Sequence, residues 1–227
     1  MGCGGCKWQM LSYTNQLKLK EDIVNDAFTK IKKKLPDLHV LSIIGSPQEK
    51  NYRNKIEFSF GKYITKGHKD GLDRIDGIDS NPSNLSKPSE NIVLSDRSVG
   101  FHKQGEFSKI VDIDSCALIS DTANALFDHI KNLCKSSGLP VYDQMTHQGF
   151  FRHIVIREGT NTQQFLINLA VADHNLTEST IPLWETFLEK LNTDSLLKKK
   201  VNTFFVTYNN GLADIIRSQD CETKVLW

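Results

Sequence analysis

The chain has 227 residues, of which 39% are hydrophobic and 24% charged, the proportions of an ordinary globular protein. Its formal net charge of +1 excludes a globally basic nucleic-acid binder but leaves room for a local basic face. No apolar run approaches the roughly 20 residues that span a bilayer, and the first residues lack a signal-peptide pattern. The 5 cysteines therefore favour metal binding or buried thiols over disulfides. We expect a cytoplasmic protein with no membrane partner.

The first part of the chain predicts a helix, two strands and a loop. Apolar residues recur with a helical period from Tyr13 to about Lys34, and Pro36 ends the helix. Strands are expected at Leu38–Ile44 and at Tyr52–Gly61, and the second alternates apolar and polar residues. Residues from about 65 to 97 are rich in Gly, Asp, Asn, Ser and Pro, which predicts an inserted surface loop.

The rest of the chain predicts strands joined mainly by hairpins. The expected elements are strands at Ser98–His102 and Lys109–Ile113, a helix from Ser120 (the N-cap) to Ser137, a hairpin of Phe150–Arg157 and Gln164–Ala172, a helix at Pro182–Leu191 and a strand at Val201–Tyr208. The fold class is therefore α+β, with a mainly antiparallel sheet flanked by helices. The final triplet, Val225-Leu226-Trp227, is typical of a strand cut short, so we expect one truncated domain over residues 1–227.

Three cysteines are candidate metal ligands. The turn Cys3-Gly4-Gly5-Cys6 presents two thiolates to one metal or cluster, and its glycines let the backbone fold around them. Cys116 follows a predicted strand, whereas Cys134 and Cys221 are interpreted as structural or incidental. Soft thiolate sites usually need four ligands, so these three are one short. Incidental thiols near a frayed terminus remain the alternative.

Two groups of cations are candidate nucleic-acid contacts. Arg53 and Lys55 lie on one face of a predicted strand, roughly 6.6 Å apart, which suits adjacent backbone phosphates. Arg152, His153 and Arg157 on the hairpin are second candidates. A solvated strand face is the competing interpretation for both groups. No Gly-rich nucleotide loop and no Ser/His/Asp set is present, so no catalytic residue is assigned.

Several segments, in order, resemble the S-adenosylmethionine-dependent RNA uracil-5-methyltransferases, in particular the 23S ribosomal-RNA branch that carries a [4Fe-4S] cluster. They are Cys3-Gly4-Gly5-Cys6 with Gln9, Tyr52-Arg53-Asn54-Lys55, Val99-Gly100-Phe101, Ile110-Val111-Asp112-Ile113 with Cys116, and Arg152-His153 through Val155-Ile156-Arg157. The resemblance covers nearly the whole chain. It implies the central domain of such an enzyme, without the N-terminal barrel and the C-terminal methyltransferase domain.

The resemblance also implies ligands and partners. Cys3, Cys6 and Cys116 match three of the four cluster ligands, while the fourth would lie before Met1, so we expect the cluster to be absent or incomplete in this chain. S-adenosylmethionine, the nucleophile and the base belong to the C-terminal domain. The implied partner is structured RNA. The resemblance favours ribosomal over transfer RNA, a choice that the residues themselves leave open, and no obligate protein partner is inferred.

Two alternatives come from other classes of protein. The chain could be a free-standing RNA-binding module with a structural zinc, or a metal-free α+β interaction domain in which the cysteines are inert. Zinc content and RNA binding by the chain itself favour the first. Unchanged stability after replacement of Cys3 and Cys6 by Ser favours the second.

Overall fold

The computed structural model describes residues 3–66, 92–216 and 221–227. Its helices are α1 (Tyr13–Lys32), α2 (Asp121–Ser136), the short 3-10 helix η1 (Asp173–Asn175), α3 (Ile181–Thr193) and α4 (Ser195–Lys200). Its strands are β1 (Lys55–Lys66), β2 (Ile92–Lys103), β3 (Glu106–Asp112), β4 (Phe151–Gly159), β5 (Gln164–Val171), β6 (Thr203–Tyr208) and β7 (Glu222–Val225).

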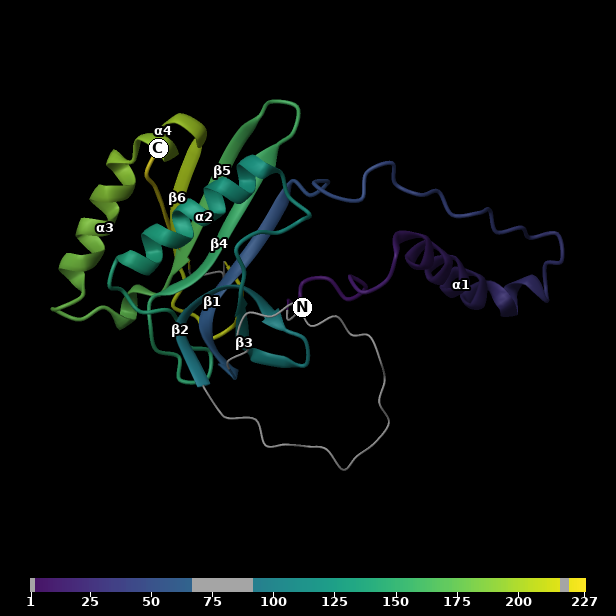
Figure 1. Ribbon diagram of the computed structural model, residues 1–227, viewed down its shortest axis with the longest axis horizontal. Helices are drawn as coiled ribbons and strands as arrows, with labels where there is room; N and C mark the ends of the chain where they lie inside the picture. The colour runs from purple at the N-terminus through teal and green to yellow at the C-terminus, as the bar shows by residue number, and fades with distance from the viewer. Residues whose placement is uncertain (1–2, 67–91, 217–220) are drawn as a thin grey trace.

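The strands form one sheet in the order β3-β2-β1-β4-β5-β6-β7 (Figure 1). Within the described ranges, five neighbouring pairs are antiparallel and one, β5 with β6, is parallel. The α+β class is confirmed. The expectation of a mainly antiparallel sheet is corrected to a mixed sheet, because the chain after β5 passes through α3 and α4 and re-enters the sheet in the same direction.

Aromatic side chains join the sheet to the helices that cover one of its faces. Phe58 of β1 stacks on Phe127 of α2 with ring centroids 3.8 Å apart. Phe60 stacks on Phe151 of β4, which in turn meets Phe187 of α3 edge to face. Figure 1 shows α2 lying across the strands. One continuous core therefore holds β1, β4, α2 and α3 together.

The local signals in the middle of the chain are confirmed. Ser120 caps α2 by accepting a hydrogen bond from the backbone N–H of Ala123 at 3.1 Å. The helix ends before Gly138, whose φ of +81° is the left-handed conformation that glycine adopts without strain. Strands β4 and β5 pair as the predicted hairpin.

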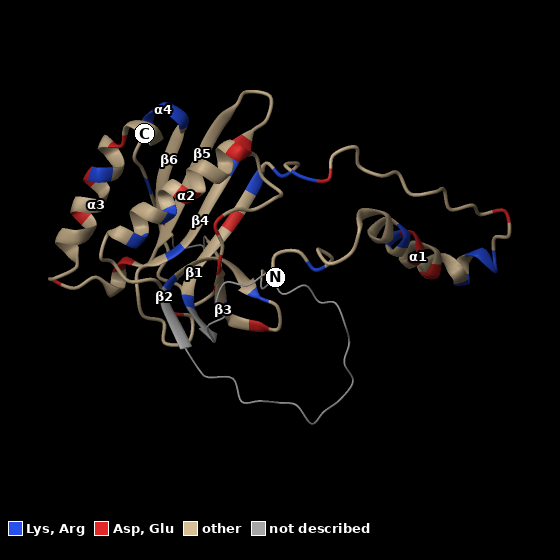
Figure 2. Ribbon diagram, viewed as in Figure 1, with Lys and Arg blue, Asp and Glu red and all other residues tan. Residues whose placement is uncertain are grey.

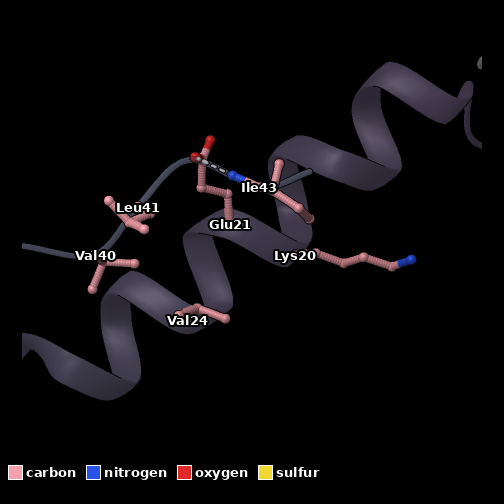
Figure 3. A pocket seen from close by; sticks show the side chains of 6 residues that line it. All are labelled: Lys20, Glu21, Val24, Val40, Leu41 and Ile43. Carbon is pink, nitrogen blue, oxygen red and sulfur yellow. Dashed lines mark hydrogen bonds between the residues drawn. The ribbon is translucent and has the colours of Figure 1, made fainter. Parts of the chain in front are cut away.

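The N-terminal part differs from expectation. Helix α1 forms as predicted, but none of its residues is buried, and Figure 1 shows it to one side of the sheet. The predicted strand at Leu38–Ile44 is wrong, because no strand of the described ranges pairs with this run, which lies along α1 instead. Its Ile43 N–H donates to Oε1 of Glu21 at 3.2 Å. Between the run and the helix lies a hollow, lined by Lys20, Glu21, Val24, Val40, Leu41 and Ile43 (Figure 3).

Other boundaries moved as well. Strands β1 and β2 extend into the predicted loop from both sides, and residues 67–91 of that loop lie outside the described residues. Of the last triplet, Val225 ends β7, which pairs with β6, and Leu226 and Trp227 follow the strand. The lysines at 198–200 form the end of α4 (Figure 2). No helix in the described ranges is both long and apolar enough to cross a membrane.

Arg152 of β4 is an internal anchor. Arg152 is only 2% exposed, and the Cζ atom of its guanidinium lies 4.2 Å from the centroid of the Tyr142 ring. The same group donates to the backbone carbonyls of Asn209 at 2.8 Å, Gly211 at 2.5 Å and Ala213 at 2.6 Å. These bonds hold the segment 209–213, which follows β6, against the sheet. The burial of Arg152 does not support the predicted RNA contact.

Replacement of Arg152 by Met is expected to lower the free energy of unfolding by about 2–4 kcal/mol, because several carbonyls lose their charged donor at once. Urea denaturation measures this loss. Arg157→Met is the matched control, since Arg157 is exposed at the other end of the same strand and should change stability by less than about 0.5 kcal/mol. Equal losses in the two variants would contradict the anchoring role.

Candidate functional site

The cysteine turn packs on the end of β2. The backbone N–H of Gly5 donates to Sγ of Cys3 at 3.5 Å. A Cβ added to Gly4 would lie 2.0 Å from the carbonyl oxygen of His102, and one added to Gly5 would lie 3.1 Å from the ring of Phe101. The two glycines are therefore required by the close approach of the turn to the strand.

Cys116 lies in the same neighbourhood. Burial raises the pKa of its thiol, and the nearby thiols of Cys6 and Cys3 raise this pKa further, while Arg53 acts in the opposite direction. The structure thus brings the three predicted ligands and one predicted cation together. Their donor chemistry suits a soft metal. In the part of the chain that the structure describes, however, no three Cys, His, Asp or Glu side chains are arranged to hold a metal ion.

A basic surface lies at the start of β1, where we define it as Arg53, Lys55 and Arg157. All three residues are exposed, and Lys55 is paired with Arg157 across β1 and β4. Arg53 precedes the strand, where its N–H donates to the carbonyl of Leu118 at 2.8 Å, two residues after Cys116. Figure 2 shows basic residues at this end of β1. The basic surface is therefore next to the cysteines, and like charges on it are held close by the strand register.

His153 is not part of this surface. It is 1% exposed, faces Ser59 across the β1–β4 pair, and its Nδ1 lies 3.4 Å from Oγ of Ser59. Its Nε2 lies 3.2 Å from Oδ1 of Asp214. The predicted RNA contact at His153 lacks support, because this ring is directed to an internal carboxylate. Alternation along the strand indicated which face His153 occupies but not what covers that face.

Asp214 joins two histidines that sequence reasoning did not connect. Its Oδ2 lies 2.9 Å from Nε2 of His102. Nδ1 of His102 lies 2.5 Å from the carbonyl oxygen of Phe107, so both ring nitrogens face acceptors, which favours the charged imidazolium. The hydrogen bond to Asp214 accordingly raises the pKa of His102, against the effect of burial. Burial would raise the pKa of Asp214, but hydrogen bonds from His102 and His153 outweigh it and hold that pKa well below its usual value.

Comparison with known proteins places this geometry in context. No protein-family model matches the chain. The crystal structure of Pyrococcus abyssi tRNA (uracil-54, C5)-methyltransferase in complex with S-adenosyl-L-homocysteine has the same fold over 99% of this chain, with a TM-score of 0.57 and 20% sequence identity. The chain covers 41% of that structure.

Curated relatives carry related names. An uncharacterized RNA methyltransferase of Clostridium acetobutylicum is 28% identical over 97% of this chain, and one of Caldanaerobacter subterraneus is 30% identical over 74%. The chain spans 41% of the first relative and 30% of the second. It is therefore similar to one part of proteins that are considerably longer.

The Asp214 contacts predict a specific dependence of stability on pH. The raised pKa of His102 gives stability that is present at low pH and is lost as pH rises through that pKa, whereas the lowered pKa of Asp214 gives stability that is lost as pH falls. Their joint contribution is greatest between about pH 4 and 6.5, between the ordinary pKa values of the two groups. Asp214→Asn should cost about 1.5–3 kcal/mol near pH 6 and less at pH 8.

Urea denaturation of the wild type and the variant at a series of pH values measures this difference. Asp128→Asn is the control, because Asp128 is exposed on α2, and it should give a small difference that does not peak between those pH values. A pH-independent cost of Asp214→Asn would contradict the charged contact.

Proposed function

We propose that the chain is the RNA-recognition and cysteine-bearing part of an S-adenosylmethionine-dependent RNA uracil-C5 methyltransferase that acts on 23S ribosomal RNA. The observation that carries the proposal is the basic surface beside three cysteines, on a fold shared with a tRNA uracil-C5 methyltransferase. Relatives named RNA methyltransferases support the same class. We assign no catalytic residue and no S-adenosylmethionine site to this chain.

The basic surface suits the phosphate backbone of a folded RNA. Lys55 and Arg157 are paired across β1 and β4, so the sheet holds the two residues side by side. The backbone N–H of Arg53 is hydrogen-bonded to the loop after Cys116, and this bond fixes the position of the Arg53 backbone. Phosphate contacts of this kind hold an RNA in position, while the bases are recognised elsewhere.

The choice of ribosomal RNA rests on the cysteines. We propose that Cys3, Cys6 and Cys116 supply three ligands to a [4Fe-4S] cluster in the longer protein, as in the 23S branch that the motifs resemble. The shared neighbourhood of the thiols and the N–H bond to Cys3 Sγ support this assignment. A cluster would tie the N-terminal turn to the loop after β3.

Replacement of Arg53 and Lys55 by Ala together is expected to weaken binding of a stem–loop RNA about tenfold at low salt and to reduce the slope of log affinity against log salt by about one to two. Filter binding or fluorescence anisotropy over a salt series measures both quantities. Lys30→Ala with Lys33→Ala, in α1 and at its C-cap, is the matched control, because it removes the same charge from exposed positions away from the sheet. Identical affinity and slope for the two double variants would show that the basic surface is only solvated.

Purification in air should leave this chain without an intact four-iron cluster, because three thiolates leave one iron without a protein ligand and open to oxidation. Iron analysis and visible absorbance measure this outcome. Cys3→Ser should lower the remaining iron uptake, whereas Cys221→Ser should leave it unchanged. Four tightly held irons per wild-type chain would contradict the three-ligand assignment, and stoichiometric zinc with RNA binding would favour a zinc module.

A further inference from the structure

An exposed aromatic ring lies on the β2–β3 hairpin, close to the cysteine turn. Phe107 of β3 is 62% exposed, although it belongs to a strand of the sheet. The hairpin beneath it is well supported, since the glycines of the cysteine turn pack on the backbone of His102 and on the ring of Phe101. The exposed ring is therefore carried by a hairpin whose backbone is held in place by packing.

The inner side of Phe107 is occupied by a histidine. The rings of His102 and Phe107 are stacked, with centroids 4.5 Å apart and planes only 3° from parallel. His102 is held on both nitrogens, by Asp214 on one side and by the Phe107 carbonyl on the other. This anchoring fixes the plane of the pair before any ligand arrives, which lowers the entropic cost of binding.

The β2–β3 hairpin that carries Phe107 also carries cations. Lys103 of β2 and Lys109 of β3 both pair with Glu106 at the hairpin, so the three side chains carry one net positive charge. These lysines remain more than a third exposed. A flat aromatic face with a positive border is the combination that single-stranded nucleic-acid sites use, because the base stacks on the ring while its phosphate meets the charge.

We propose that Phe107, stacked on His102, is a stacking platform for an unpaired nucleobase of the RNA substrate. The proposal rests on the proposed function, and it adds a second contact point distinct from the basic surface. Stacking requires only a π face, so the platform accepts any base and holds a loop or bulge rather than reading its sequence. A protein partner would instead bind Phe107 through its apolar surface, and an aliphatic side chain at this position would serve as well as a flat ring.

The test therefore separates the need for an aromatic ring from the need for any apolar side chain. The wild-type chain is compared with Phe107→Ala, Phe107→Leu and Phe107→Trp for binding to a stem–loop RNA with a single-stranded loop, and to the same RNA with abasic loop positions. We expect Phe107→Ala and Phe107→Leu to weaken binding of the intact RNA about tenfold, with the salt slope unchanged. Phe107→Trp should retain affinity, and its added fluorescence should be quenched by the intact RNA but not by the abasic RNA.

Phe28→Ala on α1 is the matched control, because Phe28 is also exposed but lies away from the hairpin. It should leave RNA binding unchanged. If the charge variants of the basic surface weaken binding while Phe107→Ala does not, the platform is wrong and the proposed function stands. Retained affinity in Phe107→Leu would also overturn it, in favour of a general apolar contact. Absence of RNA binding by the wild-type chain would overturn the platform and the proposed function together.

Discussion

The carboxylate of Asp214 is the contact on which the polar side of this structure depends. It meets His102 of β2 through one oxygen and His153 of β4 through the other, so it spans β1 and ties a loop that follows β6 to strands far from it in sequence. Arg152 fixes the same loop through its backbone carbonyls. Because these groups are polar and largely buried, each needs the others as partners, and the network holds the loop in one position.

The two sides of the sheet use different chemistry. On one side, α2 and α3 cover stacked aromatic rings, whose packing depends on complementary shape and not on specific polar partners. On the other side, polar groups organise the hairpin that carries Phe107 and the cysteine turn, and the basic surface lies at the start of β1, where that strand pairs with β4. The apolar side therefore gives stability, and the polar side determines where candidate ligand groups lie.

Much of the fold could be predicted because its signals are local. The Ser120 cap, the turn between β4 and β5 and the alternation in β1 each involve residues within a few positions of one another. The strand predicted at Leu38–Ile44 failed because no strand of the described residues pairs with this apolar run. The burial of Arg152 and His153 could not be predicted for a related reason. The segment that covers them follows β6, more than fifty residues later, and a strand pattern does not report such a partner.

Helix α1 has a consequence for how the molecule unfolds. Its 20 residues include none that is buried, so its hydrogen bonds are supported by capping and by contact with the run at 38–44 rather than by the core. Isolated helices of this length are only marginally stable in water. The helix should therefore open and close independently of the sheet, as a separate unit of low cooperativity, and its amides should exchange with solvent long before those of β4 and α2.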